Sequence, residues 1–173
     1  MRLTSLAAAA ALLASVATPA FAQDAAAVNS FTGPRVGVTV GTGGNNFIDF
    51  DGQTIGIDAG YDIAFGNNGV IGLGAEYQTD LGDGFFDVNE TALLGRIGGK
   101  AGNNALVYAT GGYTRVNGGA NPFTGNAEDG YRVGLGAEFG VGAGPAVKLE
   151  QRYFNYGNGV DGFQTVAGLG IRF

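Results

Sequence analysis

A chain of 173 residues with 34 glycines, no cysteine and no histidine has room for one domain and lacks the side chains that many catalytic and metal sites need. The absence of cysteine excludes disulfides and thiolate metal sites, and the absence of histidine removes the commonest general base and transition-metal ligand. A net charge of −6 argues against nucleic-acid binding, which needs a basic face, and we expect neither a nucleic-acid partner nor a cofactor.

The first 22 residues predict a secretory signal peptide. Arg2 supplies the positive start, and the apolar run from Leu6 to Val16 is too short to span a membrane as a helix. Ala20-Phe21-Ala22 fits the small-x-small cleavage rule. We therefore expect cleavage before Gln23 and a single domain over residues 23–173.

From Pro34 onward, stretches of alternating side chains predict β-strands, because successive side chains of a strand point to opposite faces. The predicted strands cover residues 35–41, 54–65, 70–78, 90–100, 105–116, 131–141, 146–156 and 163–173. The stretch 105–116 is ambiguous by itself, because both of its parities carry a tyrosine. Eight strands is an even number, as single-chain outer-membrane barrels of bacteria require.

The connections between these strands alternate in length. Short Gly/Asn-rich turns follow residues 65, 100 and 140, whereas longer segments cover residues 41–53, 79–89, 117–129 and 155–161. Short turns at one end and long loops at the other match the plan of outer-membrane barrels, whose turns are periplasmic. The predicted loops contain Asp49, Asp51, Asp80, Asp83, Asp87, Glu128, Asp129 and Asp161, without lysine or arginine, so we expect them to attract cations.

Charged residues fall on the strand face opposite the apolar one. The bases on this face are Arg35, Arg96, Lys100, Arg132, Lys148, Arg152 and Arg172, and the acids are Asp58, Asp62, Glu76, Glu138 and Glu150. Two interpretations fit this pattern: a soluble sandwich with its charges in water, or a barrel with its charges in the lumen. Arg115 is the one base expected on the outward face, at the outer interface, where it could reach a lipid phosphate.

The aromatic residues favour the membrane barrel. On the apolar face, the loop ends of the strands carry Tyr77, Tyr113, Tyr131, Tyr153 and Phe163, and the turn ends carry Tyr61, Phe65, Phe139 and Phe173. Two aromatic belts around an aliphatic band are typical of the two headgroup interfaces. The belts also resolve the stretch 105–116: with Tyr113 outward, Tyr108 and Thr110 face the interior.

Two terminal motifs carry a family resemblance. The run Val147-Lys-Leu-Glu-Gln-Arg-Tyr-Phe-Asn-Tyr156 is similar to the penultimate strand of small eight-stranded outer-membrane proteins of the OmpA-barrel, OmpX and opacity-protein type, with Gln151 where that family usually has tyrosine. The ending Gly168-Leu-Gly-Ile-Arg-Phe173 resembles their last strand. The resemblance implies an all-β, eight-stranded antiparallel up-and-down transmembrane β-barrel in the bacterial outer membrane, expected to be a monomer with both termini periplasmic. It also implies contacts with lipid bilayer and lipopolysaccharide, and Phe173 as the signal that barrel assembly machinery reads.

The expected activity is not enzymatic, because lipid-modifying and protease barrels typically depend on a histidine and the mature chain has one serine, Ser30. We predict a structural, adhesive or surface-interaction role through the acidic loops, toward a surface ligand or host partner that the sequence does not identify. The alternative is a narrow passive channel, since interior glycines leave space in an eight-stranded barrel.

A lumenal ion network is the candidate site. Its predicted members are Arg35, Asp58, Asp62, Glu76, Arg96, Arg132, Glu138, Lys148, Glu150, Arg152 and Arg172. The turn after Gly140 sets a register in which Glu138 faces Lys148, so we predict an ion pair between these two.

Overall fold

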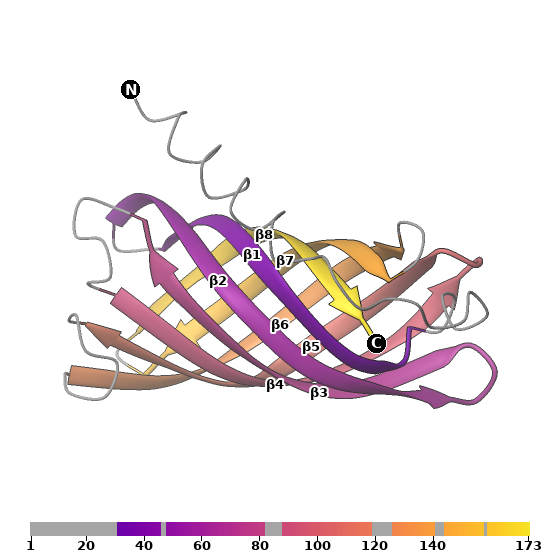
Figure 1. Ribbon diagram of the computed structural model, residues 1–173. Helices are drawn as coiled ribbons and strands as arrows, with labels where there is room; N and C mark the ends of the chain where they lie inside the picture. Colours follow the sequence, from indigo (N-terminus) through magenta and orange to yellow (C-terminus); the bar gives the residue numbers. More distant parts are fainter. Residues whose placement is uncertain (1–30, 46–47, 82–87, 119–125, 141–143, 158) are drawn as a thin grey trace, which may run out of the picture.

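The computed structural model describes residues 31–45, 48–81, 88–118, 126–140, 144–157 and 159–173, which form one closed antiparallel barrel (Figure 1). Its strands, each paired with the next in sequence, are β1 Gly33–Asn45, β2 Ile48–Phe65, β3 Gly69–Asp80, β4 Val88–Ala101, β5 Ala105–Gly118, β6 Asn126–Gly140, β7 Pro145–Tyr156 and β8 Val160–Arg172. β8 closes the barrel on β1, from the pair Arg35–Arg172 to the pair Asn45–Gly162. The predicted fold class is confirmed, while the predicted signal peptide lies outside the described residues.

The strands extend further into the predicted loops than the sequence indicated. β1 stays paired with β2 as far as Asn45 and Ile48, so the predicted loop 41–53 is largely a continuation of this hairpin. Glycines at positions 41, 43 and 44 hide the alternation there, although their backbones still pair. The loop assignment was likewise wrong for the strand residues Asp49, Asp51, Asp80, Glu128, Asp129 and Asp161, whereas Asp83 and Asp87 lie outside the described residues.

Burial is the inverse of that in a soluble protein. Large apolar side chains face outward, among them Leu73 at 68% and Leu135 at 70% exposure, while the two largest fully buried side chains are Arg132 and Arg152. A sandwich core would bury the leucines and leave the arginines in water. This outward apolar band instead suits the hydrocarbon of a bilayer. Among the described residues, no helix is long and apolar enough to cross a membrane.

Aromatic side chains border the apolar band as predicted. At the loop end, the Tyr153 ring lies 6.3 Å from Tyr131 and 5.2 Å from Phe163, centroid to centroid. On β5, Tyr113 is exposed and Tyr108 is buried, so the belts assigned the two faces of this strand correctly.

Candidate functional site in the barrel lumen

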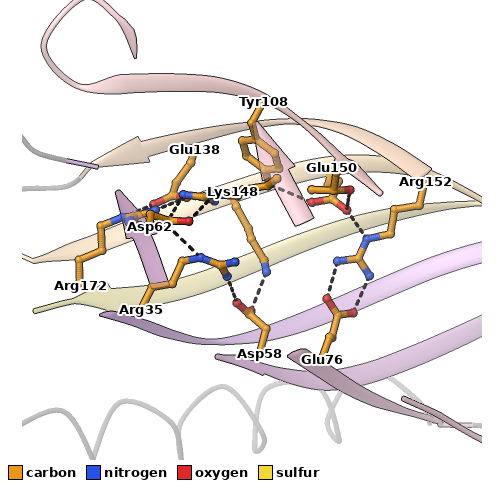
Figure 2. A network of polar contacts seen from close by, with 12 residues as sticks. Arg35, Asp58, Asp62, Glu76, Tyr108, Glu138, Lys148, Glu150, Arg152 and Arg172 are labelled. Carbon is orange, nitrogen blue, oxygen red and sulfur yellow. Dashed lines mark hydrogen bonds and ion pairs between the residues drawn. The ribbon is translucent and has the colours of Figure 1, made fainter. Parts of the chain in front are cut away.

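The turn end of the lumen is organised around one carboxylate, Asp62 of β2, which is fully buried. Three arginines from three other strands donate to it. Arg35 Nε lies 3.1 Å from Asp62 Oδ2 and Arg172 Nη1 lies 2.8 Å from the same atom (Figure 2). Arg96 Nη2 lies 2.7 Å from this atom as well. Arg35 and Arg172 are direct neighbours across β1 and β8, so this shared carboxylate offsets a contact between like charges.

Two further acids, Asp58 and Glu138, and one further base, Lys148, complete this group. We call it the inner tier, and its members are Arg35, Asp58, Asp62, Arg96, Glu138, Lys148 and Arg172. Glu138 Oε1 accepts from Arg172 Nε at 2.7 Å, and Glu138 Oε2 accepts from Arg96 Nη1 at 2.9 Å. Asp58 accepts from Arg35 Nη1 at 2.8 Å and from Lys148 Nζ at 2.6 Å. Each acid therefore binds at least two cations, as buried charges require.

A second group, the outer tier, lies nearer the loop end and consists of Glu76, Glu90, Arg132, Glu150 and Arg152. Arg152 binds Glu76 through both of its terminal nitrogens, at 2.6 and 2.8 Å, and its Nε donates to Glu150 Oε1 at 2.6 Å (Figure 2). Such bidentate pairs are among the strongest hydrogen-bonded ion pairs in proteins. With a side-chain exposure of 1%, Arg152 makes these bonds out of contact with bulk water.

Tyr108 of β5 joins the two tiers. Its hydroxyl donates to Glu150 Oε2 at 2.9 Å, and the guanidinium carbon of Arg96 lies 4.9 Å from the centre of its ring. The hydrogen bond connects to the outer tier and the cation–π contact to the inner tier. Tyr108 thus links the polar contacts of the two tiers.

Glu90 is a lumenal residue that was not predicted from the sequence. Glu90 is buried and accepts from Arg132 Nη1 at 2.9 Å and from the Tyr156 hydroxyl at 2.9 Å, and the side chains of Gln78 and Thr114 also donate to it. Its parity could have revealed it, because Glu90 shares the interior face of β4 with Arg96.

The predicted pairing of Glu138 with Lys148 was wrong, although the register behind it was correct. Glu138 does face Lys148 across β6 and β7. However, Lys148 extends to Asp58 on β2, and Glu138 binds Arg96 and Arg172 instead. Planar guanidinium groups match the carboxylate of Glu138 better than an ammonium does, and the flexible lysine stem reaches another acid.

Glycines make room for these long side chains. A Cβ at Gly168, which faces Lys148 on β8, would lie 2.7 Å from Lys148 Cε, and one at Gly136 would lie 2.6 Å from Tyr108 Cζ. A cavity between the tiers measures about 50 Å³, and its lining includes charged side chains together with Gly37, Gly74 and Gly170. This volume holds a few waters rather than a continuous column. No cluster of three or more potential metal ligands occurs in the described part of the chain.

Outside the barrel, tyrosine hydroxyls at the loop end are held by neighbouring polar groups. Tyr77 donates to Asn89 at 2.6 Å, Tyr153 to Asp161 at 3.4 Å, and Tyr113 to Asp129. Arg115 is half exposed and its Nε lies 3.8 Å from Asp129 Oδ1. At the other end of the barrel, Phe173 is 61% exposed, and its main-chain nitrogen donates to Pro34 O at 3.1 Å.

Comparisons with known proteins agree with this architecture. The family model of the outer membrane protein beta-barrel domain matches residues 8–173. A comparison with curated proteins gave no match.

Three solved structures share the fold at low sequence identity. Neisserial surface protein A is 13% identical, with 81% of this chain and 96% of that chain covered and a TM-score of 0.56. Ail of Yersinia pestis, in complex with the heparin analogue sucrose octasulfate, is 11% identical, with 82% and 97% covered and a TM-score of 0.59. The outer membrane enzyme PagL is 15% identical, with 80% and 99% covered and a TM-score of 0.54. At these identities the likeness concerns the fold alone.

Proposed function

The chain belongs to the outer membrane protein beta-barrel domain family, and on that premise we propose that it is a non-conducting surface barrel, with a lumen closed by ion pairs and a loop end that makes its contacts. It crosses the bacterial outer membrane with eight strands. The observation that carries the proposal is the pair of ion-bonded tiers, which leave a cavity of about 50 Å³.

Closure of the lumen is supported by the burial of its charges. Arg132 and Arg152 are each 1% exposed, and Asp62 of the inner tier is 1% exposed. An aqueous channel would wet these groups, because an open water path hydrates the charges that line it. Eight strands also enclose an interior that side chains can fill, whereas larger barrels leave a channel. A narrow passive channel is the alternative, and its support is the glycine-lined cavity between the tiers.

The surface role is supported by the charge at the loop end. Asp80, Glu128, Asp129 and Asp161 lie at the outer ends of their strands, and Asp129 lies 3.8 Å from the exposed base Arg115. Ail has been solved with a heparin analogue that is an octasulfate, and thus a polyanion. The acidic rim of this chain repels polyanions, so we propose cationic ligands, including the divalent ions that accompany lipopolysaccharide phosphates. We propose no enzymatic activity, since the sequence has no histidine to act as a base.

Conductance in planar bilayers tests closure, and wild-type protein is expected to show no steady current. Large, stable currents would reject the proposal in favour of the channel. Binding of oligolysine and of sucrose octasulfate to the barrel in nanodiscs tests the surface role. We expect oligolysine binding that Asp129→Asn with Asp161→Asn weakens. Preferential binding of sucrose octasulfate would contradict the proposed preference for cationic ligands.

A further inference from the structure

Apolar side chains lie at the periplasmic mouth of the lumen, next to Lys100, which is the neighbour of Leu106 across β4 and β5. Val70 and Leu106 are among the first inward-facing residues after the β2–β3 and β4–β5 turns, which places them at the mouth of the barrel. Side chains at an open mouth would be wetted by the periplasm. Both are 0% exposed, so another group covers them.

Phe31 supplies the cover. It precedes β1, is 4% exposed, and packs in one apolar cluster with Val70, Leu106 and Tyr108. The guanidinium carbon of Arg172 lies 5.6 Å from the centre of the Phe31 ring, so the ring also contacts the inner tier. Phe31 is therefore part of the lumen filling, although it lies outside every strand.

The seam of the barrel fixes the path by which the chain reaches this position. Gly33 has a φ of +98°, which L side chains rarely adopt, and a Cβ there would lie 2.4 Å from the carbonyl oxygen of Phe173. The next residue, Pro34, accepts a hydrogen bond from the Phe173 main-chain nitrogen. The turn that places Phe31 over the mouth thus depends on closure between β1 and β8.

We propose that Phe31 is an apolar cork that closes the periplasmic mouth of the lumen to water and ions, an inference that rests on the proposed non-conducting barrel. A hydrophobic constriction excludes ions because water leaves a narrow apolar passage. The cork keeps water from entering at the periplasmic mouth. The ion pairs of the inner tier then stay in a dry interior, where their mutual attraction is strongest.

The absence of cysteine allows a direct accessibility test. In the full-length mature barrel in lipid nanodiscs, Val70→Cys introduces a single thiol, and its rate of modification by a small charged thiol reagent is measured. We expect slow modification with Phe31 present and an acceleration of about tenfold or more in Phe31→Ser, because the cover of one large apolar side chain is lost. Phe31→Leu, which keeps an apolar cover, should remain slow.

Phe163→Ser is the matched control, because it removes a 60% exposed aromatic from the outer face and should leave the rate unchanged. Circular dichroism verifies that each variant is folded, and Leu106→Cys replaces the reporter if Val70→Cys does not fold. Fast modification with Phe31 present, or equal rates with Phe31 and Ser at this position, would overturn the cork. Steady wild-type conductance, measured separately, would reject the non-conducting barrel itself.

Discussion

Two lumenal bases on the same strand provide a test of how dry the lumen is. Arg152 and Lys148 lie four residues apart on β7 and both face the interior. Arg152 is 1% exposed and makes three hydrogen bonds to Glu76 and Glu150, whereas Lys148 is 14% exposed and makes one, to Asp58. Asp58 retains Arg35 at 2.8 Å when Lys148 is removed, but Arg152 is the main partner of two acids.

The expected destabilisations differ accordingly. Arg152→Met should lower the free energy of unfolding by about 3–5 kcal/mol, because it removes the arginine bound to Glu150 and both short bonds to Glu76, which keeps only Arg132 Nη2 at 3.3 Å. Lys148→Met should cost about 0–1 kcal/mol, close to the value of a solvent-exposed pair. Reversible guanidinium unfolding in lipid vesicles, followed by circular dichroism, measures both. Glu76→Gln combined with Arg152→Met should recover part of the loss, since the pair is coupled. Equal costs for the two single variants would refute the assignment of a dry outer tier.

Three other predictions address processing, assembly and the missed acid. The intact mass of the outer-membrane form should correspond to a chain that begins at Gln23, and retention of Met1 would contradict the signal peptide. Deletion of Phe173 should lower the yield of barrel in the outer membrane, as quantified in membrane fractions, because it removes the proposed assembly signal and the backbone bond to Pro34; an unchanged yield would exclude both effects. Glu90→Gln should destabilise the barrel by about 1–3 kcal/mol in the same unfolding assay, because Arg132 Nη1 would lose its charged acceptor and the remaining ion pair of Arg132, from Nη2 to Glu76, is longer, at 3.3 Å. A neutral effect of Glu90→Gln would mean that water serves Arg132.

Alternation along the chain was enough to predict the faces of the strands and one register. The turn after Gly140 correctly placed Glu138 opposite Lys148, because a short turn fixes which residues of a hairpin are neighbours. The turn could not reveal the partner of Lys148, because Asp58 lies 90 residues away in the sequence, on β2, which is not adjacent to β7. Contacts across a lumen depend on the tilt of the strands and on side-chain rotamers, and no local pattern records either.

Phe31 was beyond sequence reasoning for a related reason. Alternation can be recognised only within a strand, and Phe31 precedes β1 with one residue, Thr32, between them. Only the closed barrel reveals that the chain turns at Gly33 and places this ring against Val70 and Leu106. Glu90, by contrast, was predictable from the sequence, because it has the same parity as Arg96 and therefore shares the interior face of β4.

The ion network has a consequence for how the barrel finds its register. The inner tier contains four bases and three acids, and the outer tier two bases and three acids, all on inward-facing positions of their strands. Because side chains alternate, a slip of one residue in any of these strands would turn its charges toward lipid. An arginine or lysine at the bilayer midplane costs about 2–4 kcal/mol on the outside of a barrel. Buried ion pairs contribute little net stability by themselves, so their larger effect here is to destabilise barrels in which a strand has slipped by one residue relative to the native one.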